Sequence, residues 1–142
     1  MAEAEIEIAI RREVEALHDF IAGWIRGEIA NDKRTFQDGF AARLDQEFRN
    51  IQPNGGVLTR DDIVGGIRGA HGASPDFAIS VHDVALRGAY DGGTVFLATY
   101  LERQTGAKNT TPPDNDRVSS VLMRRDGDGR FTWLHLHETA RN

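Results

Sequence analysis

The sequence contains no cysteine among its 142 residues. Disulfide bonds, thiolate metal sites and cysteine nucleophiles are therefore excluded, and stability must come from packing. The sequence also lacks an excess of positive charge, because 17 Lys+Arg stand against 22 Asp+Glu, a formal net charge of -5. Such a chain has no summed positive field that would attract phosphate backbones or anionic lipid. We therefore expect neither nucleic acid nor a membrane as a partner.

Long apolar runs are also absent. None approaches the roughly 20 residues that a membrane-spanning helix needs. Glu3, Glu5 and Glu7 make the N-terminus acidic, whereas a signal peptide begins basic and then becomes apolar. The sequence therefore predicts a soluble, cytoplasmic protein. Its mass of 15.7 kDa and the lack of an internal repeat predict a single domain over residues 1–142 with one hydrophobic core.

Apolar residues recur at three- and four-residue steps in three parts of the first half. The strongest pattern predicts a long amphipathic helix over about residues 5–26, and a weaker one predicts a helix over 32–44. Thr59 is the expected N-cap of a third helix that ends near position 71. Between the second and third helices, turn residues separate two short strands expected at 48–52 and 57–58.

The apolar period changes to two after position 76, which is typical of strands. Four strand-length runs follow, at residues 77–87, 94–104, 117–125 and 130–139. An Asp-Gly turn at 126–129 joins the last two runs into a hairpin. Three helices followed by four long strands predict an α+β fold, with the helices packed on one face of an antiparallel sheet.

This order of elements resembles the cone-shaped, cystatin-like fold of the nuclear transport factor 2-like (NTF2-like) superfamily. Residues 99–104, 117–127 and 133–139 carry the similarity at the level of motifs. They most resemble the association domain of calcium/calmodulin-dependent kinase II and the bacterial DUF4440 and SnoaL-like families. The resemblance implies three N-terminal helices on a strongly curved antiparallel sheet of four long strands plus one or two short ones. Because the superfamily hosts many unrelated activities, it implies little about function.

The resemblance also shows where this sequence departs from its relatives. Association domains have three arginines at the positions that hold Glu102, Arg117 and Glu138 here, so a carboxylate-binding pocket of three arginines is not expected. Isomerases of the superfamily carry a catalytic aspartate at the position of Gln52, and an amide cannot accept a substrate proton at neutral pH. Steroid isomerase chemistry is therefore not expected, whereas a cyclase-like acid could be either glutamate.

Alternate residues of a strand share a face, so the strand pairing of the superfamily would bring Glu102, Arg117 and Glu138 together on the concave face. Tyr100 and Trp24 would form apolar walls beside them. One arginine between two carboxylates can orient a polar ligand and raise a carboxyl pKa, or it can be a structural ion-pair network. We expect these five residues to bind a small organic molecule. An acid/base enzyme of the isomerase or polyketide-cyclase type, using Glu102 or Glu138, and a pure association module are the alternatives.

The histidines and the outer sheet face give weaker indications of function. His135 and His137 share a strand face, but no third ligand is recognisable, so we expect no metal site and no cofactor. His18 is expected to be a surface histidine or one satisfied by local hydrogen bonds. The outer face of the closing strands is too apolar to lie in water, which predicts a two-fold homodimer. The residues expected in that interface are Leu97, Leu101, Leu122, Phe131, Trp133 and His135.

Overall fold

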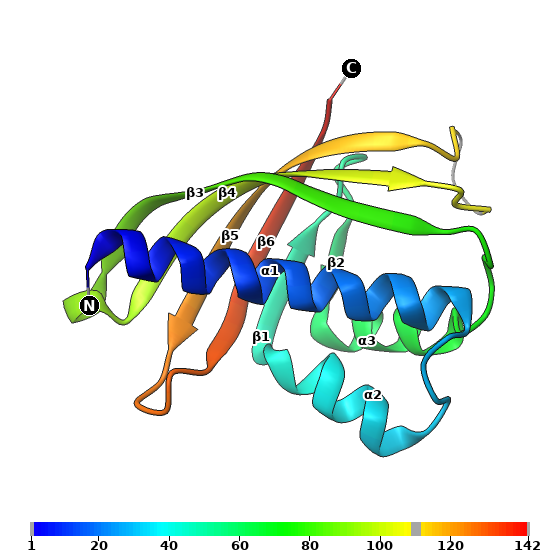
Figure 1. The fold of residues 1–142 in the computed structure, drawn as a ribbon, viewed down its shortest axis with the longest axis horizontal. Helices are drawn as coiled ribbons and strands as arrows, with labels where there is room; N and C mark the ends of the chain where they lie inside the picture. Colours follow the sequence, from blue (N-terminus) through cyan, green and yellow to red (C-terminus); the bar gives the residue numbers. More distant parts are fainter. Residues whose placement is uncertain (1, 109–111, 142) are drawn as a thin grey trace.

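The computed structural model describes residues 2–108 and 112–141. Its element order confirms the predicted α+β class, with the described α-helices in the first half of the chain and four long strands in the second (Figure 1). Of the described helices, none is long and apolar enough to cross a membrane. In chain order the elements are α1 (Glu3–Arg26), α2 (Lys33–Gly39), the 3-10 helix η1 (Ala41–Arg43), β1 (Leu44–Ile51), β2 (Val57–Thr59), α3 (Arg60–Gly69), β3 (Ala78–Tyr90), the 3-10 helix η2 (Asp91–Gly93), β4 (Val95–Thr105), β5 (Asn115–Arg125) and β6 (Phe131–Arg141).

The described strands form one six-stranded sheet in the order β2-β1-β6-β5-β4-β3. The long strands β3 to β6 are sequential antiparallel neighbours, as predicted. The first strand, β1, runs parallel to the last, β6, which the sequence pattern did not indicate. This parallel pair sets Asn50 opposite Leu136 and so brings the start of the sheet to the end of the chain.

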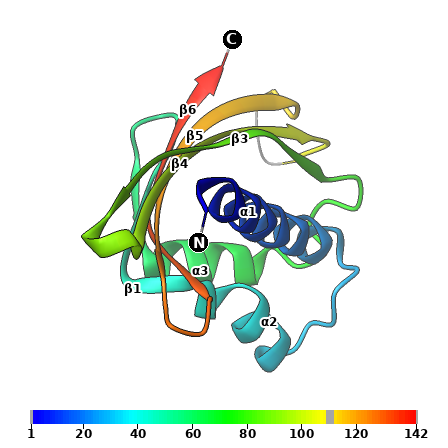
Figure 2. The same cartoon turned by 60° about the vertical axis from the view of Figure 1, so that its left-hand side comes forward.

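The sheet curves around α1, which lies along its concave face (Figure 2). Ile10, Val14 and Leu17 form the buried stripe of this helix. Fully burying one such side chain contributes about 1.5–3 kcal/mol. Two register shifts between β3 and β4, with Asp83 at a positive φ of 56°, bend the outer strand toward the helix. The curvature therefore gives the core the shape of a cone.

The ends of the helices follow the predicted local signals. Gly27 ends α1 in the left-handed conformation, with a φ of 81°, and its amide donates to the carbonyl of Trp24. Thr59 caps α3 through a reciprocal pair of hydrogen bonds with Asp62. The second helix is shorter than predicted, since α2 ends at Gly39. A Cβ at Gly39 would overlap the Phe20 ring, so the close approach of the two helices requires glycine there.

The shortened helix leaves room for a longer first strand. The apolar step from Phe40 to Leu44 fits a helix, yet Leu44 begins β1 and pairs with Trp133 of β6. Both side chains are buried in the core. Sheet pairing with a distant segment, which local periodicity does not report, therefore decides the conformation here.

A bulge in the β5–β6 ladder changes the predicted inner and outer faces. The register shifts between Leu122 and Met123, so Trp133 pairs with Met123 and points into the core. Its indole Nε1 donates to Glu13 Oε2 at 2.9 Å. Phe131 also belongs to the core, packed edge-on against Phe96. The prediction that Trp133 and Phe131 lie on the outer face is therefore wrong.

The remaining residues of the predicted interface do lie on the outer face. Leu97 and Leu101 alternate along β4 with residues of the inner face, although Leu101 is itself only 8% exposed, and Leu122 pairs with His135 across the β5–β6 ladder. Val118 on the same face is 45% exposed. α1 covers the opposite, concave face of the sheet (Figure 2).

Candidate functional site

A cavity of about 240 Å³ lies inside the cone, between α1, α3 and the concave face of the sheet. Its wall is mostly apolar and is contributed by both helices and by strands from the two ends of the chain. The apolar lining includes Leu17, Ile21, Phe48, Ile63, Ile67 and Leu136. Pockets for small organic molecules have this character, an apolar wall with a few convergent polar groups.

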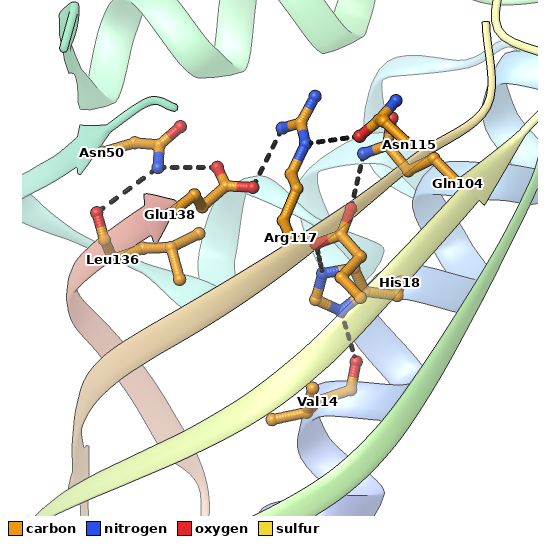
Figure 3. A network of polar contacts seen from close by, with 9 residues as sticks. Val14, His18, Asn50, Gln104, Asn115, Arg117, Leu136 and Glu138 are labelled. Atoms are coloured by element: carbon orange, nitrogen blue, oxygen red, sulfur yellow. Dashed lines mark hydrogen bonds and ion pairs between the residues drawn. The ribbon is translucent and has the colours of Figure 1, made fainter. Parts of the chain in front are cut away.

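Polar side chains gather where α1 and the strands β1, β4, β5 and β6 meet at the cavity (Figure 3). We call them the polar cluster. Strand pairing builds most of it, since Glu102 lies directly opposite Arg117 across the β4–β5 ladder and Glu138 lies opposite Ser119 two residues further along β5. The cluster comprises His18, Asn50, Glu102, Gln104, Asn115, Arg117 and Glu138.

Glu102 is held by His18 and is only 3% exposed. His18 Nε2 donates to Glu102 Oε1 at 2.9 Å, and its Nδ1 donates to the backbone oxygen of Val14 at 2.7 Å. The second carboxylate oxygen accepts a hydrogen bond from the Gln104 amide. Because a carbonyl oxygen only accepts, Nδ1 carries a proton, and an ionised Glu102 requires a proton on Nε2 as well. The geometry therefore suits an imidazolium beside a carboxylate.

The electrostatics of this pair agree with that state. Burial alone raises the pKa of Glu102, but the His18 charge and the hydrogen bonds from His18 and Gln104 outweigh it and lower the pKa to about 2. Burial lowers the pKa of His18, yet the charge and hydrogen bond of Glu102 shift it above 6.5 overall. His18 and Glu102 therefore stabilise each other's charged form.

Glu138 is held by a different set of groups. Its Oε2 accepts from Arg117 Nη1 and its Oε1 accepts from Asn50 Nδ2, both at 2.9 Å (Figure 3). Arg117 Nε donates in turn to Asn115 Oδ1 at 3.0 Å. Burial and the nearby Glu102 charge raise the pKa of Glu138, against the lowering effect of Arg117. The two carboxyls of the cluster are thus pushed in opposite directions.

Three of the five predicted site residues line the cavity, and two do not. Glu102, Arg117 and Glu138 meet as the strand alternation indicated. Trp24 is fully buried elsewhere and donates from its indole to the backbone oxygen of Ile67 at 2.8 Å. It follows His18 by six positions, so the two side chains lie about 120° apart around the helix at 3.6 residues per turn. Tyr100 is 2% exposed and packs edge-on against the His18 ring, outside the lining of the cavity.

Other residues of the cavity escaped prediction although the sequence carried signals for them. His18 follows Val14 by four residues, which places it beside the buried stripe of α1. Asn50 follows the buried Phe48 by two along β1, so alternation puts it on the inner face. Gln52, matched to the isomerase aspartate by resemblance, also lines the cavity. Across residues 2–108 and 112–141, no group of three His, Asp or Glu side chains is arranged to hold a metal ion.

Comparisons with known proteins agree on the fold. The sequence matches no protein-family model and no curated protein at a significant level. An NTF2-like protein of unknown function from Pseudomonas aeruginosa superimposes with a TM-score of 0.82 at 28% identity, covering 94% of this chain and 99% of that one. Aln2 from a Streptomyces species gives 0.71 at 15% identity, covering 99% and 94%. The association domain of the C. elegans kinase CaMKII gives 0.68 at 12% identity, covering 96% and 97%.

These similarities, together with the cone-shaped sheet around α1, define the class of the protein. The chain has the NTF2-like fold, and its 28% identity to the Pseudomonas aeruginosa protein over nearly the whole chain supports the NTF2-like superfamily. The relatives at 15% and 12% identity share its fold and carry no information about its ligand.

Proposed function

We propose that the chain binds a small organic molecule in the cone cavity, with Arg117, Glu102 and Glu138 at the polar end. This proposal depends on one observation, the mostly apolar cavity of about 240 Å³ with buried residues of the polar cluster in its wall. A purely structural association module would need no cavity, and its cone would be filled by side chains. The cavity therefore favours binding over the association module.

Arg117 supports the proposal because part of its hydrogen-bonding capacity is unused. A guanidinium carries five N–H donors. Two of its nitrogens, Nε and Nη1, donate to Asn115 and Glu138, and Nη2 has no hydrogen bond to any described residue. The side chain is 17% exposed and lines the cavity. A carbonyl or hydroxyl oxygen of a ligand would find a fixed donor here.

A thermal-shift screen of small acids and cyclic ketones tests the proposal. A ligand at 100 times its Kd stabilises the folded state by about 2.7 kcal/mol, which raises Tm by several degrees. We expect compounds that raise Tm for the wild type and for the control Arg124→Met. Arg124 lies on β5 like Arg117, but seven residues further along, where it pairs with Asp45 of β1. Arg117→Met should lose these shifts. If no compound shifts the wild type at millimolar concentration, the proposal is wrong.

An acid/base enzyme is the second candidate, and the opposed pKa shifts of Glu102 and Glu138 favour it. Two carboxyls whose environments push their pKa values apart are a common basis of acid/base catalysis. Both are nearly buried and line the cavity, at 3% and 5% exposed. Glu138, whose pKa is raised, is the group suited to exchange a proton with a substrate.

Hydrogen exchange tests this candidate without a known substrate. Cyclic ketones in deuterated water would be followed by NMR for loss of protons next to the carbonyl. We expect the wild type to exceed the buffer rate and Glu138→Gln to fall to it. An unchanged exchange rate in Glu138→Gln would assign the activity to another group.

We also propose that the protein acts as a homodimer through the outer sheet face, where Leu97, Leu101, Leu122 and His135 lie. Sedimentation velocity of Leu122→Asp, against the exposed control Ala42→Asp, tests it. A monomer for Leu122→Asp alone supports the interface, and a wild-type monomer rejects it.

The cytoplasmic location expected from the sequence stays a prediction that cell fractionation would test.

A further inference from the structure

The charges at the cavity balance within two ion pairs. His18 and Glu102 meet at 2.9 Å, and Arg117 and Glu138 meet at 2.9 Å. With all four groups ionised, the sum of their charges is zero. Among the described lining residues Lys108 is the one other charged side chain, and it is exposed to solvent. A ligand in the cavity therefore meets no buried charge that lacks a partner.

The hydrogen-bonding capacity that remains is mostly neutral. Asn50 spends its amide N–H groups on Glu138 Oε1 and on the backbone oxygen of Leu136, at 2.9 and 3.3 Å. Its amide oxygen accepts no hydrogen bond from the described residues, although the side chain is 2% exposed and lines the cavity. The Gln104 amide likewise donates to Glu102 and keeps its oxygen free of described partners. Arg117 Nη2 adds a donor.

From this balance we infer that the cavity selects neutral, hydrogen-bonding organic molecules over carboxylates and ammonium ions of the same shape. The inference rests on the proposed binding function and narrows it to a ligand class. Amides, ketones and alcohols built on one or two rings fit a cavity of about 240 Å³ with an apolar wall. Their polar end finds both a donor and acceptors in the cluster.

An anionic ligand is disfavoured by the groups it would have to approach. It would be a third negative charge beside Glu102 and Glu138, and both nearby cations are already paired with those carboxylates. Desolvating a charge without its own partner costs more than desolvating a neutral amide. An ammonium ligand is disfavoured for the corresponding reason. It would be a third positive charge beside Arg117 and His18, which are already paired with the two carboxylates.

Matched probes test the inference. Benzamide, benzoate and benzylammonium share one ring, and 2-naphthamide and 2-naphthoate share two, so each series changes mainly the charge. Titration at pH 7 would be followed by calorimetry and by tryptophan fluorescence, since Trp133 lines the cavity. We expect each amide to bind about tenfold more tightly than its charged counterparts, equivalent to about 1.4 kcal/mol.

A charge-removing variant tests the cause. Glu138→Gln leaves the Arg117 charge uncompensated, so benzoate and 2-naphthoate should bind about tenfold more tightly than to the wild type. The ratio of carboxylate to amide affinity should rise accordingly. Glu47→Gln is the matched control, because it removes the same charge from an exposed position on β1 and should change neither series. Should Glu138→Gln fail to fold, the wild-type comparison decides alone.

The possible results separate the two proposals. Amide binding with weaker binding of both ions supports the inference. Carboxylates or ammonium ions that bind the wild type as tightly as the amides overturn it while leaving the binding function intact. Carboxylate affinity that is the same in Glu138→Gln and the wild type overturns the charge-compensation cause. If none of the probes binds at millimolar concentration, the inference is rejected, and the thermal-shift panel of small acids and ketones still decides the binding function by itself.

Discussion

Replacing His18 with leucine should destabilise the fold by about 3–5 kcal/mol at pH 7, the range found when one partner of a buried ion pair is removed. The structure gives a similar magnitude. Against burial, which raises it, His18 with smaller effects of Gln104 and Arg117 lowers the pKa of Glu102 from 4.5 to about 2, and this net shift corresponds to roughly 3 kcal/mol at 1.36 kcal/mol per pKa unit. Leucine fills the space of the imidazole but leaves the Glu102 carboxylate in an apolar cavity without its cation.

The pH dependence of this loss is the sharper test. In the wild type the folded pKa of Glu102 is lowered, so its stabilising contribution is present above about pH 4.5 and disappears as pH falls toward 2. The folded pKa of His18 is raised, so its contribution is full below pH 6.5 and disappears as pH rises through the folded value. In His18→Leu, burial raises the Glu102 pKa instead, and the variant should lose stability as pH rises from 5 to 7.

Urea unfolding followed by tryptophan fluorescence at pH 5 and pH 7 measures both effects, since Trp24 and Trp133 are buried. His82→Leu is the control, because His82 is exposed on β3 and its replacement should stay within about 0.5 kcal/mol. Adding Glu102→Gln to His18→Leu should recover part of the loss at pH 7, because it removes the unpaired charge. The reasoning is refuted if His18→Leu costs less than about 1 kcal/mol at pH 7, or equally much at both pH values.

Three further substitutions test the packing, each by urea unfolding. Gly39→Ala should destabilise by about 1–3 kcal/mol, because its Cβ would overlap the Phe20 ring; an unchanged midpoint would show that the ring moves freely. Gly65→Ala should stabilise α3 by about 0.5–1 kcal/mol, because a Cβ there has no atom within 4 Å; a loss would contradict the open space. Trp133→Phe should cost about 1–3 kcal/mol by leaving Glu13 without the indole donor, and a neutral result would mean that water replaces it.

The sequence predicted the elements whose conformation depends on residues a few positions apart. The four-residue steps of α1, the Thr59 cap and the alternation of β4 and β5 all depend on neighbours along the chain, and the structure confirms them. The same alternation brought Glu102 and Arg117 together, because a regular antiparallel ladder keeps partners on one face. The centre of the site could thus be predicted from strand pattern and the resemblance.

The failures share a different cause, which is long-range pairing. A single bulge between Leu122 and Met123 moved Trp133 from the expected outer face into the core, because one shifted residue inverts every side chain beyond it. The residues next to Trp133 in the sequence do not predict that register shift, because the hydrogen-bond partner of Trp133 is Glu13, on the first helix. Because of the bulge, Trp133 on one side of it and Leu136 and Glu138 on the other all line the same cavity. A displaced register there would have to rebuild the wall and the polar cluster together, so we expect the bulge to be as necessary for the cavity as the charged residues themselves.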